Sequence, residues 1–154
     1  MRIVIDGDAC PHRVKEICER AAHEFNIDLV IVVDIDHYIV SDFTILVVEQ
    51  GRDSVDYKIV EIFQNDDILV TQDYGLSSLV LNKAVAIIHT SGFFINKNNI
   101  DELLESRHIG QKIRKAGGKT KGPSKRRKEQ DENFEKCLYK VLYARFGKLR
   151  QNKK

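Results

Sequence analysis

The chain has 154 residues, of which 42% are hydrophobic and 31% are charged, as expected of one soluble globular domain. No apolar run approaches the roughly 18 residues needed to cross a bilayer, and the N-terminus reaches Asp6 too soon to be the apolar part of a secretion signal. The 3 cysteines form no CxxC pair and the 5 histidines form neither HxH nor HExxH, which argues against a disulfide framework or a zinc site and favours a cytoplasmic protein.

The net charge of +2 conceals two oppositely charged parts. Residues 1–106 contain 8 Lys and Arg against 19 Asp and Glu, a net charge of −11, whereas residues 107–154 contain 17 against 4, a net charge of +13. Arg107 to Lys128 includes ten basic residues and no acidic one. This division predicts an acidic site beside a surface that binds polyanions.

Short apolar runs alternate with helix-like periods over the first 91 residues. We expect strands over residues 2–5, 29–33, 43–48, 67–71 and 84–88. Helices are expected over residues 11–25, 53–63 and 76–81, with Pro11 in the first turn of the first one. This alternation predicts an α/β fold: a mostly parallel five-stranded sheet joined by right-handed crossovers, with helices on both faces.

The character of the sequence changes after Ser91. Residues 99–104 and 109–115 suggest two short helices, residues 117–123 a basic loop, and residues 125–146 a final helix. We predict a single domain over residues 1–154, with an α/β core at 1–91 and a basic helical extension at 92–154.

Acidic side chains follow two of the predicted strands. Asp6 ends the first strand, Asp8 comes next but one after Gly7, and Asp73 follows the strand at 67–71. Ligands of open parallel sheets bind beyond the carboxyl ends of the strands, and Gly7 would let the chain turn sharply there. These carboxylates are therefore expected to meet at one edge.

A fourth carboxylate, Asp56, shares a helical face with Ile59 and Phe63, and Asp53 lies one turn earlier. Neighbouring carboxylates repel one another, and hard oxygen ligands of this kind favour Mg²⁺ or Mn²⁺. Each aspartate also has a simpler interpretation, because Asp53, Asp56 and Asp8 suit the first turns of helices and Asp73 suits a turn.

Four motifs resemble the YaiI/YqxD family of uncharacterised bacterial proteins over nearly the whole chain. They are DGDACP at 6–11, DSVDYKIV at 53–60, DILVTQDYGL at 67–76 and GGKTKGP at 117–123. That family is similar to PIN-like domains, whose known members are mostly Mg²⁺- or Mn²⁺-dependent ribonucleases.

The resemblance implies a three-layer PIN-like fold in which Asp6, Asp56 and Asp73 bind the metal and act in catalysis. Asp8 is particular to the YaiI/YqxD pattern, and its place beside Asp6 predicts a catalytic role and makes it a further candidate metal ligand, as Asp53 is. The DxD start departs from the usual PIN pattern. The implied function is a nuclease, with RNA as the expected substrate.

Basic residues in the second part of the chain are expected to hold the nucleic-acid backbone; we name Arg107, Lys112, Arg114, Lys119, Thr120 and Lys121. Tyr74 is able to stack on a base, although a structural role is the simpler expectation. Two alternative functions stay open. One is an RNA-binding module without turnover, and the other is a haloacid-dehalogenase-like phosphatase with Asp6 as nucleophile, Asp8 as acid/base and Lys83 as the nearest later lysine.

Overall fold

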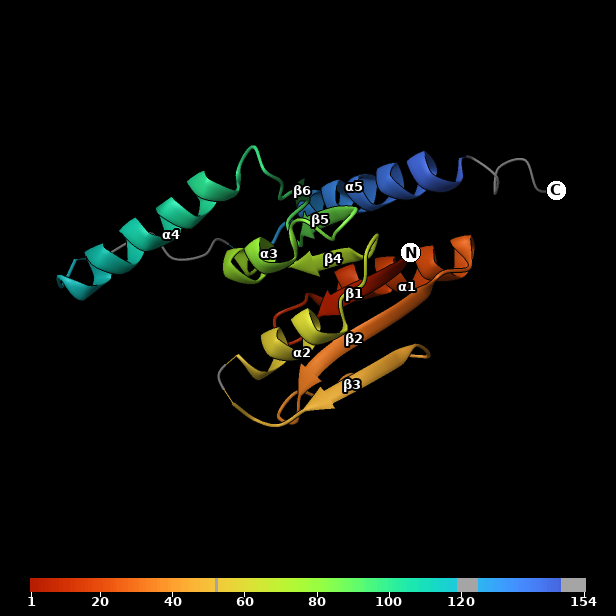
Figure 1. The fold of residues 1–154 in the computed structure, drawn as a ribbon, viewed down its shortest axis with the longest axis horizontal. Coiled ribbons are helices and arrows are strands. Elements are labelled where there is room, and N and C mark those ends of the chain that lie inside the picture. The colour runs from red at the N-terminus through yellow and green to blue at the C-terminus, as the bar shows by residue number, and fades with distance from the viewer. Residues whose placement is uncertain (52, 119–124, 148–154) are drawn as a thin grey trace.

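A computed structural model describes residues 1–51, 53–118 and 125–147 of the chain (Figure 1). Six strands form one sheet in the order β3-β2-β1-β4-β5-β6, in which β6 alone is antiparallel to its neighbour. The strands are β1 (Arg2–Asp6), β2 (Asp28–Asp34), β3 (Thr44–Val48), β4 (Ile68–Thr71), β5 (Ala86–His89) and β6 (Phe93–Phe94). The predicted α/β fold with a mostly parallel sheet is confirmed. The sequence did not indicate β6, because two residues are too few to show a periodic pattern.

Helices cover both faces of the sheet and make three layers. They are α1 (His12–Phe25), α2 (Ser54–Ile62), α3 (Tyr74–Val80), α4 (Ile100–Lys115) and α5 (Lys128–Phe146). Alternate residues of a strand point to opposite faces, so Ile3 and Ile5 pack with α1 and α5, whereas Val4 packs with α2, α3 and the start of α4. Each face thereby has its own apolar core.

The helices after residue 91 differ from their prediction. The two short helices expected at 99–104 and 109–115 are one continuous helix, α4, because no Gly or Pro interrupts residues 105–109. Its first turn is anchored by the buried Ile100, and beyond Leu104 it extends away from the body of the molecule (Figure 1). Helix α5, which we grouped with the extension, places Phe134, Leu138 and Leu142 in the core. Most of the loop expected at 117–123 lies outside the described residues.

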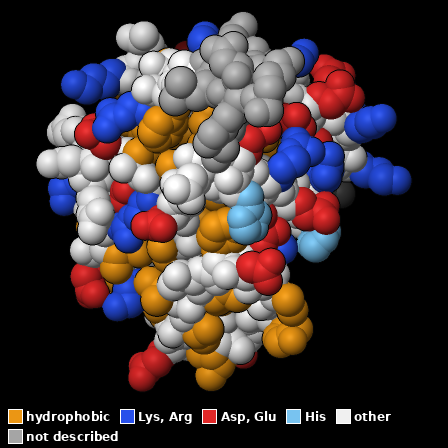
Figure 2. Space-filling view, turned by 90° about the vertical axis from the view of Figure 1, so that its right-hand side faces the viewer, with side chains coloured by type: hydrophobic (Ala, Val, Ile, Leu, Met, Phe, Trp, Pro, Cys, Tyr) orange, Lys and Arg blue, Asp and Glu red, His pale blue; other side chains and the backbone are white. Residues whose placement is uncertain are grey.

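The amino edge of the sheet contains a buried ion pair. Arg2 Nε lies 3.0 Å from Asp67 Oδ2, and the backbone N–H of Gln64 donates to the same oxygen at 2.9 Å. Asp67 is 1% exposed, so this pair is part of the interior rather than a surface contact. Figure 2 faces this side of the molecule, where acidic and basic side chains are both visible between apolar ones.

None of the helices in the described part of the chain has an apolar stretch long enough to cross a membrane.

Candidate metal site

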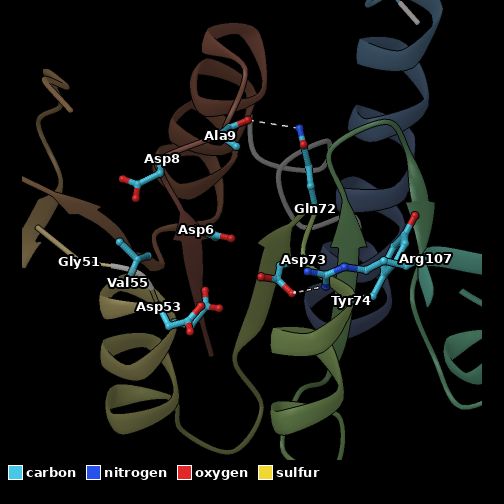
Figure 3. A pocket seen from close by; sticks show the side chains of 11 residues that line it. Asp6, Asp8, Ala9, Gly51, Asp53, Val55, Gln72, Asp73, Tyr74 and Arg107 are labelled. Atoms are coloured by element: carbon cyan, nitrogen blue, oxygen red, sulfur yellow. Dashed lines mark hydrogen bonds and ion pairs between the residues drawn. The ribbon is translucent and has the colours of Figure 1, made fainter. Parts of the chain in front are cut away.

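The carboxyl edge of the sheet contains an acidic pocket of about 390 Å³ (Figure 3). Parallel strands end together at this edge, and the loops that follow β1 and β4 bring distant aspartates to it. Among the residues that the structure describes, the charged side chains that line the pocket are Asp6, Asp8, Asp53, Asp56, Asp73 and Arg107. All five predicted acidic residues therefore line one pocket, with a single cation among these charged side chains.

Asp6 is positioned by the hydroxyl of Thr71, which ends the neighbouring strand. Thr71 Oγ1 donates to Asp6 Oδ2 at 2.7 Å, and it accepts from the backbone N–H of Asp73 at 2.9 Å. Burial raises the pKa of Asp6 from 3.8 to about 6; the hydrogen bond from Thr71 opposes this rise, and the charges of Asp73 and Asp8 add to it. One threonine thus connects the ends of β1 and β4 and orients two of the acids.

Asp56 lies in the first turn of α2 and faces the same pocket. Its pKa is raised from 3.8 to about 7, chiefly by burial, and also by the charges of Asp73 and Asp6, a hydrogen bond with the Asp73 carboxyl and the charge of Asp53. A hydrogen bond between two carboxyl groups requires a shared proton. The acids therefore lie close enough to oppose each other's ionisation.

Asp53 precedes α2 in a left-handed conformation with φ of 68°. Its side chain makes no capping hydrogen bond to the helix and is exposed beside the pocket. Asp53 thus occupies the predicted N-cap position of α2, but its carboxylate is not committed to the helix.

Asp73 has a double role. Its Oδ1 accepts from the backbone N–H of Leu76 at 3.0 Å and so caps α3. The same oxygen lies 3.6 Å from Arg107 Nη1, while the other carboxylate oxygen faces Asp6 across the pocket (Figure 3). Asp73 is thus the N-cap of α3 rather than a turn residue, and its carboxylate also takes part in the acidic pocket.

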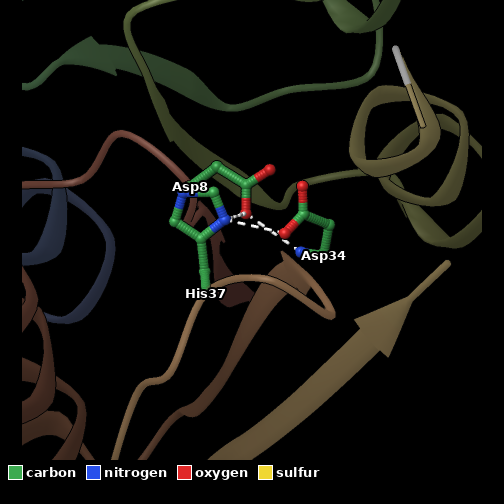
Figure 4. Close-up of side chains that lie close together, drawn as sticks. All are labelled: Asp8, Asp34 and His37. Atoms are coloured by element: carbon green, nitrogen blue, oxygen red, sulfur yellow. Dashed lines mark hydrogen bonds and ion pairs between the residues drawn. The ribbon is translucent and has the colours of Figure 1, made fainter. Parts of the chain in front are cut away.

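Asp8 is held on the β2 side of the pocket by residues that we did not predict. Asp8 Oδ1 accepts from the backbone N–H of Asp34 at 3.0 Å and lies 3.3 Å from His37 Nδ1, which is 2.7 Å from Asp34 Oδ1 (Figure 4). Asp8, Asp34 and His37 each offer one possible metal-ligand atom, and these three atoms lie within 4.8 Å of one another. The hydrogen bond with Asp34 raises the pKa of His37, and the same bond lowers the pKa of Asp34. When His37 is protonated, its charge offsets the two carboxylates.

Asp34 ends β2 as Asp6 ends β1, so the rule that led to Asp6 also indicates Asp34. Gly7, between Asp6 and Asp8, is required for a reason other than the sharp turn that we expected. Its backbone N–H donates to Val32 O at 2.8 Å, and a Cβ on Gly7 would lie 2.5 Å from Val33 Cγ1. Its backbone is not left-handed; the chain simply passes too close to β2 for a side chain.

The predicted basic residues are only partly brought to the pocket. Arg107 lies at its rim, whereas Lys112 and Arg114 lie further along the exposed part of α4 and do not line it. The remaining three, Lys119, Thr120 and Lys121, lie outside the described residues.

The phosphatase alternative requires a lysine at the acids. Lys83 precedes β5, and its backbone oxygen accepts from the N–H of Asp66, just before β4. Both positions belong to the amino edge of the sheet, so Lys83 does not support that alternative.

These features place the chain among α/β proteins with an acid-lined pocket at the carboxyl edge of a parallel sheet. It belongs to the uncharacterised YaiI/YqxD family, whose model matches residues 4–144. The resemblance found in the motifs is thereby confirmed.

Relatives in several bacteria support this assignment. A UPF0178 protein of Ruminiclostridium cellulolyticum is 43% identical over 90% of each chain, and one of Clostridium tetani is 43% identical over 98% of this chain and all of its own. A UPF0178 protein of Enterococcus faecalis is 41% identical over 92% of this chain and 97% of its own. No solved structure matches the chain, so the likeness to PIN domains stays a prediction.

Proposed function

We propose that this protein is a Mg²⁺- or Mn²⁺-dependent nuclease that hydrolyses phosphodiester bonds, with RNA as its substrate. The observation that carries the proposal is that Asp6, Asp56 and Asp73 come from different elements yet share one pocket, where the charge of Asp73 opposes the ionisation of Asp6 and Asp56, and that of Asp6 opposes the ionisation of Asp56. Holding several carboxylates together is unfavourable unless a cation neutralises them.

The donor set fits a hard divalent ion. Carboxylate oxygens are the ligands that Mg²⁺ and Mn²⁺ prefer, and such ions usually retain waters and bind substrate phosphates. Asp6, Asp56 and Asp73 would hold the ion, with Asp8 and Asp53 at the sides of the pocket. A bound ion of this kind supplies an activated water and stabilises the charge that develops on the phosphate.

The chain's own residues would orient the acids and the substrate. Thr71 fixes one oxygen of Asp6, and the N–H of Leu76 fixes one oxygen of Asp73. Arg107, with a side chain that is 49% exposed, is placed to pair with a phosphate that enters beside Asp73. The basic, exposed part of α4 extends the positive surface away from the pocket, as expected for contacts with a nucleic-acid backbone.

The test is cleavage of mixed RNA by the pure protein in Mn²⁺, with the wild type compared with Asp6→Asn. The amide keeps the size of the side chain and an acceptor for Thr71 but removes the charge. Loss of an outer-shell partner costs roughly 10–100-fold in metal affinity or activity, so we expect the loss of a ligand to cost more. Asp42→Asn, which removes the charge of an exposed aspartate before β3, is the matched control and should cleave like the wild type.

Equal cleavage by the wild type and Asp6→Asn would contradict the proposal. So would salt-sensitive RNA binding that persists in EDTA without any cleavage in Mn²⁺, which is the behaviour of a binding module.

A further inference from the structure

Beside the acidic pocket, three partly buried rings form a continuous series. The Tyr74 and His89 ring centroids are 5.8 Å apart with 36° between the planes, and those of His89 and Phe93 are 4.5 Å apart with 14° between them. We propose that this series, the aromatic platform, stacks an unpaired base next to the phosphate bound in the acidic pocket. The protein would then act on single-stranded nucleic acid. This inference rests on the proposed function and adds the form of the substrate.

The position of the platform follows from the sheet. His89 is the register partner of Thr71, the residue that orients Asp6, so β5 carries the platform to the same carboxyl edge as the acids. Gln72 spans the gap, because its Nε2 donates to Ala9 O at 3.2 Å and to Thr90 Oγ1 at 2.8 Å. Tyr74 lines the acidic pocket and also starts the ring series. A phosphate at the acids and a base on Tyr74 would therefore be neighbours.

The platform is also chemically suited to stacking. Ser91 N–H donates to His89 Nδ1 at 3.0 Å, so a neutral His89 carries its proton on Nε2. Burial, and to a smaller extent the charge of Arg126, lowers the pKa of His89 to about 4. The ring series is consequently uncharged at neutral pH, as expected of a surface on which a base stacks.

Stacking of this kind selects unpaired strands. A base in a duplex is already stacked on its neighbours, whereas a base in a single strand is free to lie on an aromatic side chain, and every base has a suitable face. The affinity gained from the platform should depend on the presence of a base and little on salt. Phosphate contacts behave in the opposite way.

The experiment measures binding of 5′-fluorescein-labelled octamers by anisotropy in Ca²⁺, and a gel shows whether the strands remain intact. The ligands are single-stranded RNA and DNA, a duplex of the same sequence, and a strand of equal length without bases. Tyr74→Leu removes the ring and keeps apolar bulk against the core, while Tyr74→Phe keeps the ring. Tyr57→Ala is the matched control, because Tyr57 is 73% exposed on α2 and does not line the pocket.

Loss of one base–aromatic stack lowers affinity by roughly 5- to 150-fold. We expect Tyr74→Leu to bind base-containing single strands about tenfold more weakly, or worse, at every salt concentration, and to bind the abasic strand like the wild type. Tyr74→Phe and Tyr57→Ala should bind both strands like the wild type.

The inference is overturned if Tyr74→Leu weakens binding of abasic and base-containing strands equally, because the ring would then act only through the fold. Wild-type protein that binds the duplex as tightly as the single strand overturns it as well. Base-dependent binding without cleavage would end the nuclease proposal and leave the platform. Cleavage that Asp6→Asn abolishes, together with binding that does not depend on the bases, would end the platform proposal and leave the nuclease proposal.

Discussion

Replacing Asp6 by Asn should stabilise the metal-free protein, with a gain that develops between about pH 4 and pH 6 and is complete above that range. The folded state holds the proton of Asp6 up to a pKa of about 6, whereas the unfolded carboxyl ionises at its ordinary value of 3.8. Because the folded state binds the extra proton between these values, the stability of the wild type falls as the pH rises through this window. The variant has no such carboxyl, so its stability should not show that fall.

The size of the effect follows from the same values. The difference between 3.8 and about 6 corresponds to an upper limit of about 3 kcal/mol in the free energy of unfolding. For a chain of this length, that limit is roughly 6–12 °C in melting temperature. Losing the charge of Asp6 also eases the ionisation of Asp56, which acts in the same direction.

The assay is urea unfolding followed by circular dichroism in EDTA at pH 4, 6 and 8, with Asp42→Asn as the control of equal charge change. We expect Asp6→Asn and the wild type to be nearly equal at pH 4 and the variant to be more stable at pH 8. Addition of Mn²⁺ at pH 8 should then stabilise the wild type far more than the variant. A variant that is less stable than the wild type at pH 8, or a difference that is the same at every pH, would show that folding does not raise the pKa of Asp6.

Three further changes test the surroundings of the pocket. Asp67→Asn should lower the free energy of unfolding by about 3 kcal/mol, because it breaks the buried ion pair with Arg2 of β1. Mn²⁺ binding, measured by calorimetry, should stay unchanged. A loss of stability below about 1 kcal/mol would contradict the role given to that pair. Gly7→Ala should lower the free energy of unfolding by about 1–3 kcal/mol, because the new Cβ would lie 2.5 Å from Val33 Cγ1. An unchanged urea midpoint would show that the contact is easily relieved. Arg107→Ala should weaken RNA binding and reduce the slope of log affinity against log salt by about one. The control is Arg13→Ala, which removes a similarly exposed arginine on α1 and should leave that slope unchanged. Equal slopes for the two variants would show that Arg107 does not contact phosphate.

The sequence predicts the centre of the sheet well because β1, β2 and β4 are short, apolar and buried on both faces. The runs at Arg2–Asp6 and Ile68–Thr71 have no competing helical period, so both strands and the acids that follow them were found. Helix α4 was divided in two, since its exposed half lacks the apolar spacing that marks a packed helix. The spacing of apolar residues in the sequence therefore identifies helices and strands that pack on a core. It is a weaker guide to a helix that extends away from the core.

In the site, too, the features that follow from the order of the strands could be predicted, whereas the contacts between distant residues could not. That Asp6 and Asp73 meet follows from strands ending at one edge, and it could be predicted. That Asp8 bonds to the backbone of Asp34 and lies beside His37 depends on how the loop after β1 lies against β2, at the Gly7 contact. Such contacts are tertiary, and no local pattern in the chain encodes them.

The most direct measurement is anomalous scattering from a crystal soaked in Mn²⁺. We expect a peak among the carboxylate oxygens of Asp6, Asp56 and Asp73, at roughly 2.0–2.2 Å from each bound oxygen. A peak at Asp8, Asp34 and His37 instead, or none at either group of side chains, would contradict this expectation.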